Sequence, residues 1–267
     1  MSNRKLWIVK AGSQMVIAGG PPLLRKWMTQ VDRLNSEFDI DVIWVTSGAI
    51  ATARRHFPLA TKKTNMVQKQ ALSALGQPLV HQQYAAALKK SSRTAAQVLL
   101  TADDLGDPKR RKNLVRTLTT LVMWNILPIL NENDAVATEE IQFGDNDRLS
   151  ALVAKHMKAD RLILLTDVEG LFDRDPRTPQ SPSSPPAKII SHVPSVSKKL
   201  LASLSGASPS GVGSGGMLSK ILAGQTAHRS GVVTHLIKGD RPEALLDLAR
   251  NKTMIGTTIG TTGRRTK

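Results

Sequence analysis

The sequence contains no cysteine, which excludes several classes of protein at once. A chain of 267 residues without cysteine forms no disulfide, offers no thiolate nucleophile and builds no cysteine-ligated zinc or iron–sulfur centre. Aromatic residues make up only 3% of the chain, with a single tyrosine, so the stacking platforms of single-strand nucleic-acid binders are hard to build. The lack of cysteine is consistent with a reducing compartment.

Long apolar runs are also missing. The most apolar stretch, residues 118–130, is interrupted by Asn125 and Pro128 and is shorter than the ~20 residues that span a bilayer. Residues 1–12 lack the apolar core and the small-residue cleavage site of a secretory signal. We therefore expect a cytoplasmic protein without a membrane partner.

Acidic residues are too few to balance the basic ones. The chain has 37 Lys and Arg but only 21 Asp and Glu, which gives a net charge of +16. Such an excess favours an anionic partner: nucleic acid, a membrane surface or a small anionic substrate. The basic residues form separated clusters, at residues 54–55, 62–63, 89–93, 109–112 and 264–267. This distribution favours a solvated basic surface and argues against nucleic acid as a partner.

Short apolar runs rich in β-branched residues predict buried parallel strands. They lie at residues 5–10, 41–46, 95–101, 126–131, 160–166 and 232–238. Helical patterns separate them, at residues 21–38, 65–90, 109–124, 149–157, 216–229 and 243–250. Strands joined by helices need crossover connections, so the fold class is α/β: a three-layer α/β/α sandwich with a central, mainly parallel sheet.

One proline-rich segment, residues 175–188, has five prolines among fourteen residues and reads as an exposed loop. It separates residues 1–174 from residues 189–267. We expect a single domain over residues 1–267 in which this loop lies between the two parts.

Glycine turns follow the first two predicted strands, at Lys10-Ala11-Gly12-Ser13 and at Thr46-Ser47-Gly48. Ligands of such sheets collect at the carboxyl ends of the strands. Glycine lets backbone N–H groups approach a phosphate, and a nearby lysine adds a charge. Each turn alone is equally compatible with tight strand–helix packing.

Carboxylates are concentrated in one segment of this basic chain. Six of the 21 acidic residues fall between residues 131 and 147, namely Glu132, Asp134, Glu139, Glu140, Asp145 and Asp147. Helix capping and a solvated loop explain one or two of them. Their density favours a site that binds a substrate ammonium or amide, or that holds lysines and magnesium in place.

Two further segments have the character of a nucleotide site. Leu165-Thr166-Asp167 ends an apolar strand, and residues 210–220 form a glycine-rich loop that leads into a helix carrying Lys220. The loop satisfies G-x-G-x-x-G, but no strand precedes it, which argues against a dinucleotide fold. The sequence signatures of Walker A loops, protein kinases, G-x-S-x-G hydrolases and H-E-x-x-H metalloproteases are absent. The six histidines are scattered without metal-ligand spacing, so we expect them to have structural roles.

Together, these motifs resemble the amino-acid kinase family, most closely its members that phosphorylate glutamate. The segments that carry the resemblance are residues 9–13, 45–51, 74–77, 131–154, 164–177 and 214–220. Gln14, Ala53 and Ser214 depart from the residues usual in the family. The resemblance stops short of the RNA-binding-like PUA domain that often follows, so we expect the catalytic domain without a PUA domain.

The resemblance implies transfer of the γ-phosphoryl group of ATP to the side-chain carboxylate of L-glutamate, the first step of proline biosynthesis. That carboxylate is already ionised at pH 7, so the reaction needs cations rather than a general base. Mg²⁺ is expected to be held mainly by the ATP phosphates, without a protein metal site. A homo-oligomer (dimer or tetramer) and feedback inhibition by proline are further expectations from the family.

Motif matching also assigns residue roles by resemblance. The catalytic residues are Lys10, Lys220 and Asp147. The glutamate-binding residues are Ser47, Gly48, Asp134 and Asn146, in the mainly acceptor-binding part of the chain (residues 1–174). The ATP-binding residues are Lys10, Gly12, Ser13, Thr166, Asp167, Ser214, Gly215, Gly216, Met217, Leu218, Ser219 and Lys220, with residues 189–267 completing the nucleotide part.

Two alternatives stay open. Kinases of N-acetylglutamate, aspartate, carbamate or UMP share the fold and the lysines, although the block at residues 131–147 favours glutamate. A weakly catalytic basic relative that binds nucleic acid would instead show steeply salt-dependent binding.

Overall fold

The computed structural model describes residues 4–57, 64–89, 91, 93–136, 146–174, 176, 186–205, 214–251 and 256–261. Within these residues, eight strands form one sheet in the order β3-β4-β2-β1-β5-β7-β8-β6. The strands are β1 (Lys5–Ala11), β2 (Ile40–Val45), β3 (Ala95–Leu100), β4 (Leu127–Glu132), β5 (Arg161–Thr166), β6 (His192–Val193), β7 (Val233–Lys238) and β8 (Thr257–Ile259). All neighbouring strands are parallel except the antiparallel pair β7–β8.

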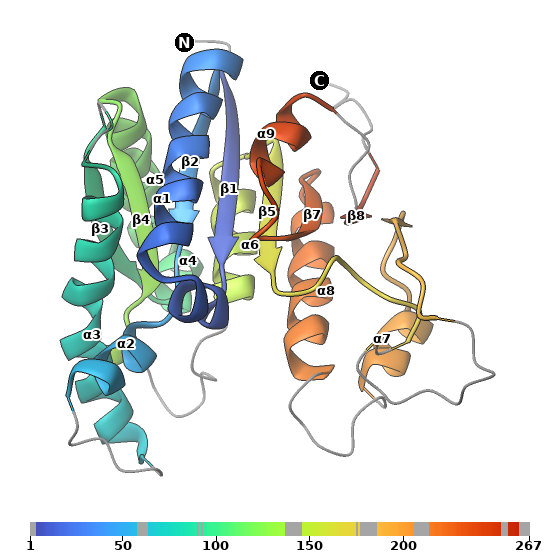
Figure 1. Cartoon of the computed structure of the whole chain (residues 1–267), viewed down its shortest axis with the longest axis horizontal. Helices are drawn as coiled ribbons and strands as arrows, with labels where there is room; N and C mark the ends of the chain where they lie inside the picture. The colour runs from blue at the N-terminus through green and yellow to red at the C-terminus, as the bar shows by residue number, and fades with distance from the viewer. Residues whose placement is uncertain are drawn as a thin grey trace.

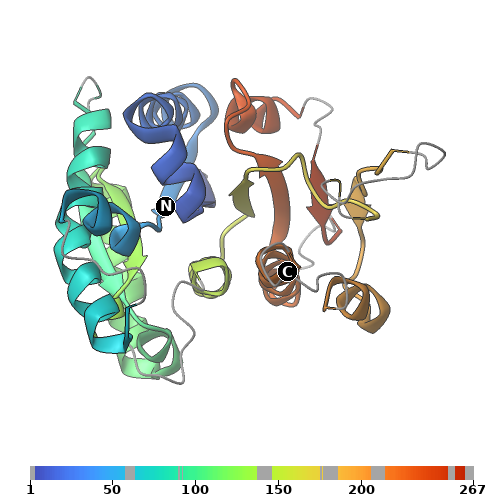
Figure 2. The ribbon, with the colours of Figure 1, turned by 60° about the horizontal axis from the view of Figure 1, so that its bottom comes forward.

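Helices cover both faces of this sheet. In Figure 2, α1 (Ser13–Phe38) and α9 (Ala244–Ala249) lie on one side of the strands, and α6 (Asn146–His156) and α8 (Ser214–His228) lie on the other. The remaining helical elements are α2 (Ala49–His56), α3 (Met66–Ala87), α4 (Ala102–Gly106), α5 (Pro108–Met123), the 3₁₀ turn η1 (Asp134–Val136) and α7 (Lys198–Ser205). The predicted three-layer α/β/α sandwich with a mainly parallel sheet is confirmed.

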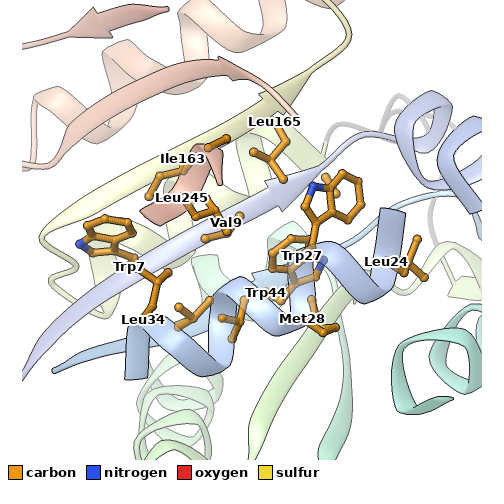
Figure 3. Packing of buried hydrophobic residues seen from close by; sticks show 14 of the residues in the cluster. Trp7, Val9, Leu24, Trp27, Met28, Leu34, Trp44, Ile163, Leu165 and Leu245 are labelled. Carbon is orange, nitrogen blue, oxygen red and sulfur yellow. The ribbon is translucent and has the colours of Figure 1, made fainter. Parts of the chain in front are cut away.

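Alternation along β1 divides the core between the two faces. Trp7 and Val9 belong to the cluster under α1 and α9, whereas Ile8 belongs to the cluster under α6 and α8. The first cluster contains Trp27 and Trp44, whose ring centroids are 5.5 Å apart (Figure 3). Because consecutive strand residues point to opposite faces, Lys10 is on the α6–α8 face.

The six predicted strands are all present. The first helix differs, because it begins at Ser13 rather than at Pro21 and is interrupted at Gly20, whose φ of 52° is left-handed. Pro21 and Pro22 then start the second part of α1, where the missing N–H groups of proline are tolerated. The strands β6 and β8, of two and three residues, were not predicted, since such short elements carry no apolar run.

Some predictions fall outside the described residues. Most of the proline-rich segment lies there, namely residue 175 and residues 177–185, as do Glu139, Glu140 and Asp145 of the acidic segment. Within the described chain, no helix is long and apolar enough to cross a membrane.

Candidate active site

The carboxyl ends of β1, β2 and β5 meet at one edge of the sheet. Lys10 pairs in register with Val45 of β2 and with Leu164 of β5, so the turns after these three strands are neighbours. Figure 1 shows the arrowheads of β1 and β5 pointing to this edge. The structure therefore brings Gly12, Ser13, Ser47 and Thr166 to the same side of the molecule, as the sequence predicts.

Asp147 contacts both predicted lysines at this edge of the sheet, on the face that α6 and α8 cover. Its Oδ1 lies 2.6 Å from Lys10 Nζ and its Oδ2 lies 3.1 Å from Lys220 Nζ. Burial alone would raise the pKa of Asp147, but the two lysines outweigh it and lower the pKa to about 2. The carboxylate is therefore ionised at neutral pH and fixes two cations that lie 210 residues apart in the chain.

The second turn of α8 completes this arrangement. The hydroxyl of Ser219 donates to Asp147 Oδ2 at 2.7 Å, and Lys220 Nζ also donates to the carbonyl oxygen of Gly216 at 3.2 Å. Met217 is half-buried and packs against the apolar cluster of this face. The predicted residues Ser214 and Gly215 begin α8, and the side chain of Ser214 lies outside the described part.

Asn146, next to Asp147, lies at the centre of a buried polar network. Its Nδ2 lies within hydrogen-bond distance of the carbonyl of Thr46, the hydroxyl of Ser47 and Oδ1 of Asn131, at 2.7 to 2.9 Å. Its Oδ1 has no hydrogen-bond partner although it is buried. Buried acceptors are nearly always satisfied, so an unpartnered acceptor beside the pocket marks a position where a bound ligand would donate.

A pocket of about 220 Å³ adjoins this network. Four predicted substrate-binding residues (Ser47, Gly48, Asp134 and Asn146) line it, together with Ser13, Asn131, Arg54 and the first residues of α2. The positive φ of Gly48 (99°) allows the sharp turn from β2 into α2 that shapes this wall.

Asp134 is the acidic residue of the pocket wall. The hydroxyl of Ser73 in α3 donates to its Oδ2 at 2.8 Å. Burial raises the pKa of Asp134, and the bond from Ser73 opposes this rise only in part. A bound cation would offset the cost of burying this carboxylate.

The residues at the end of β5 are placed differently from one another. Thr166 is buried and its hydroxyl donates to Asp167 Oδ1 at 3.2 Å, whereas Asp167 itself is exposed. The carbonyl of Thr166 accepts from the backbone N–H of Gly239, which follows β7. Both residues lie at the sheet edge that carries Lys10.

Comparison with known proteins places this geometry in a family. The profile of the Amino acid kinase family matches residues 5–239, which is most of the chain. The chain belongs to the amino acid kinase family. The matched range includes Lys10, Asp147 and Lys220 and every strand except β8.

Relatives with close sequences share one name. The chain is 38% identical to the glutamate 5-kinase of Alcanivorax borkumensis over 93% of its length, and 44% identical to that of Geobacillus thermodenitrificans over 79%. It is 42% identical to the glutamate 5-kinase of Meiothermus ruber over 92% of its length. The chain spans 65%, 55% and 63% of these three relatives, respectively.

Two solved structures of the amino acid kinase fold resemble the chain. A carbamate kinase from Giardia lamblia bound to AMP-PNP has a TM-score of 0.64 at 16% identity, covering 98% of this chain and 100% of its own. An isopentenyl phosphate kinase has a TM-score of 0.59 at 13% identity, covering 95% of this chain and 100% of its own. At these identities the likeness establishes the fold alone.

Several residues of this amino acid kinase site were not predicted individually. Gln77 of α3 donates to the carbonyl of Glu132 and accepts from Asn131, both at 2.9 Å. Gln77 and Asn131 lie in motifs that resemble the family, and this resemblance was the only sequence feature that pointed to them as site residues. No sequence feature pointed to Ser73 or Arg54 as site residues.

Among the described residues, no group of three or more His, Cys, Asp or Glu side chains could hold a metal ion.

Proposed function

We propose that the protein transfers the γ-phosphoryl group of ATP to the side-chain carboxylate of L-glutamate, giving L-glutamyl 5-phosphate and ADP, the first step of proline biosynthesis. One observation carries the proposal: Asp147 holds Lys10 and Lys220 together directly beside a polar pocket that its neighbour Asn146 lines. The names of the relatives at 38% to 44% identity support the same reaction.

The lysines supply what this transfer needs. A glutamate side chain is ionised at pH 7, so it attacks without a general base, but it repels the triphosphate. Two lysines and one aspartate leave a formal net charge of +1 at the sheet edge. In this proposal Lys10 and Lys220 stabilise the transferring phosphoryl group, and Asp147, ionised and paired, positions them.

The pocket walls suit the two ends of an amino acid. Asp134 and the open Oδ1 of Asn146 are acceptors, which would bind the substrate ammonium. The hydroxyl of Ser47, the backbone after Gly48 and the guanidinium of Arg54 are donors, which would bind a carboxylate.

ATP would lie on the other side of the lysines. Its phosphates would contact Gly12, Ser13 and the first two turns of α8 (Ser214 to Lys220), and its nucleoside would lie near Thr166 and Asp167. Mg²⁺, when bound to ATP, would neutralise phosphate charge. Residues 1–174 would then mainly bind the acceptor, and residues 189–267 would complete the nucleotide part. Homo-oligomerisation and feedback inhibition by proline stay predictions from the resemblance.

The test is ADP release from Mg-ATP with L-glutamate, N-acetyl-L-glutamate, L-aspartate, carbamate and UMP supplied separately. We expect turnover with L-glutamate and at least about 100-fold lower kcat/KM with N-acetyl-L-glutamate, whose blocked ammonium leaves Asp134 and Asn146 without their partner. The other acceptors should also have a lower kcat/KM, because the side chain of L-aspartate is one methylene shorter and carbamate and UMP lack the two ends of an amino acid. A clear preference for another acceptor would contradict the glutamate assignment and would identify that acceptor as the substrate.

A further inference from the structure

A second cavity lies away from the proposed catalytic site. Its volume is about 230 Å³, and Arg161, Ser191, His235, Asn251 and Thr258 are among the residues that line it. It lies between the first residue of β5, the middle of β7, and β8. None of these residues takes part in the proposed phosphoryl transfer.

The cavity faces the opposite side of the sheet from the lysines. Ile237, which also lines it, belongs to the apolar cluster under α1 and α9, and His235 shares its face of β7. Lys10 and Lys220 instead meet on the side of α6 and α8. Arg161 begins β5, whereas Thr166 of the proposed nucleotide site ends it. A ligand here would not overlap either substrate.

Arg161 brings a positive charge to this cavity. Within the described part of the chain no carboxylate forms an ion pair with its guanidinium, although the adjacent Asp160, which accepts from the backbone N–H of Leu6, acts on it electrostatically. Its Nη1 donates to the carbonyl of Leu248 at 3.2 Å and its Nη2 to Oδ1 of Asn251 at 3.3 Å. Both acceptors are uncharged, and the guanidinium also lies over the ring of Trp7, 5.2 Å from the centroid. Arginine has five N–H groups, so donors remain for a further partner.

His235 contributes an unsatisfied polar atom. The residue is 9% exposed, and its Nε2 is buried without a hydrogen-bond partner. Its Nδ1 lies 3.2 Å from the hydroxyl of Thr258. Burial, and then Arg161, lower the pKa of His235 to about 3, so the ring is neutral at pH 7. When Thr258 donates to Nδ1, Nε2 carries the ring hydrogen and becomes a donor.

We propose that this cavity binds a small oxyanion, a carboxylate or a phosphate, between the guanidinium of Arg161 and Nε2 of His235. Arg161 supplies the charge and a fork of N–H donors that fits two oxygens, and His235 supplies one directed donor. The volume is below the roughly 300–1,000 Å³ of sites for drug-sized ligands, so the ligand is no larger than a small metabolite.

The test follows the ring resonances of His235 by NMR in protein with isotope-labelled histidine, assigned with a His235→Gln variant. Sodium acetate and inorganic phosphate are titrated separately, with sodium chloride keeping the ionic strength constant. Only the His235 signals are used, because phosphate is also expected at the lysines. We expect a saturable shift with at least one of the two anions; the responding anion identifies the ligand as a carboxylate or a phosphate.

Variants locate the binding. Arg161→Gln should weaken the apparent Kd at least about tenfold, the loss expected for one charge-assisted contact. Ser191→Trp, at an exposed position on the cavity wall, should block the shift while leaving Arg161 and His235 in place. Arg229→Gln, at an exposed arginine in the turn after α8, is the matched control and should bind like the unaltered protein.

Two results would overturn the proposal. One is the absence of a saturable His235 shift with both anions in folded protein. The other is an unchanged Kd in Ser191→Trp or in folded Arg161→Gln, because the ring would then report binding elsewhere. Circular dichroism of each variant establishes folding, and Ser191→Trp decides the question if Arg161→Gln unfolds.

Discussion

Lys220 reaches Asp147 from the second turn of α8. Its charge is expected to matter most in the transition state, while the phosphoryl group is being transferred. Replacing it in Lys220→Ala should lower kcat roughly 100-fold or more, the usual effect of losing one group that stabilises a transition state. Steady-state kinetics should show little change in the KM for glutamate. Lys199→Ala, at an exposed lysine of α7, is the matched control. An unchanged kcat in Lys220→Ala would remove this residue from the reaction.

Asp134 is proposed to bind the substrate ammonium, so its charge should affect substrate binding rather than chemistry. Asp134→Asn keeps the shape and an acceptor for Ser73 but removes the charge. The KM for L-glutamate should rise about ten- to a hundredfold with a much smaller change in kcat. Asp103→Asn, at an exposed acid of α4, should leave both constants unchanged. A fall in kcat at constant KM would contradict the binding role.

The helix α2 lines the proposed substrate pocket, and α3 packs very closely against α2. A Cβ atom added to Gly76 of α3 would collide with the carbonyl group of Ala49, the first residue of α2. Gly76→Ala should therefore push the helices apart, destabilise the fold by about 1–3 kcal/mol and raise the KM for glutamate. Urea unfolding and steady-state kinetics measure the two effects.

Gly106→Ala is the control for this substitution, because no atom lies within 4 Å of a Cβ at that position, in α4. Its stability should stay within about 1 kcal/mol of the unaltered protein. Equal stability of the two variants would show that the approach of α2 to α3 is not fixed by Gly76.

The sequence predicts the elements that carry strong local signals. Apolar runs identify six strands, and motif matching identifies Lys10, Asn146, Asp147 and Lys220, which the structure brings together. It does not predict the kink at Gly20, where the permissive backbone of glycine lets one helical segment end and another begin. Nor does it predict the bond from Ser73 to Asp134, which spans 61 residues and depends on how α3 packs against η1.

Acid should destabilise the whole molecule through His235. Its folded-state pKa of about 3 lies below the value of about 6.5 in an unfolded chain, so the unfolded state binds a proton first as the pH falls. The contribution of His235 to the free energy of unfolding is therefore fully present above pH 6.5. Between pH 6.5 and pH 3 this contribution falls by about 1.4 kcal/mol per pH unit. Below about pH 4, protonation of Asp147 adds to the loss, since its folded-state pKa is also lowered.

Urea unfolding at pH 7, 6 and 5 measures this dependence. The free energy of unfolding of the unaltered protein should fall more steeply with acid than that of His235→Gln, in which the group does not titrate. Parallel curves for the two proteins would show that His235 takes up a proton as readily in the folded state as in the unfolded chain.

The most direct measurement of the proposed reaction is trapping of its product. Hydroxylamine converts an acyl phosphate into a hydroxamate, so protein, Mg-ATP, L-glutamate and hydroxylamine should together give glutamyl hydroxamate in step with ADP. We expect the hydroxamate to depend on all four components and to be lost in Lys220→Ala but not in Lys199→Ala. ADP release without glutamyl hydroxamate, or hydroxamate from another acceptor alone, would contradict phosphorylation of the glutamate side chain.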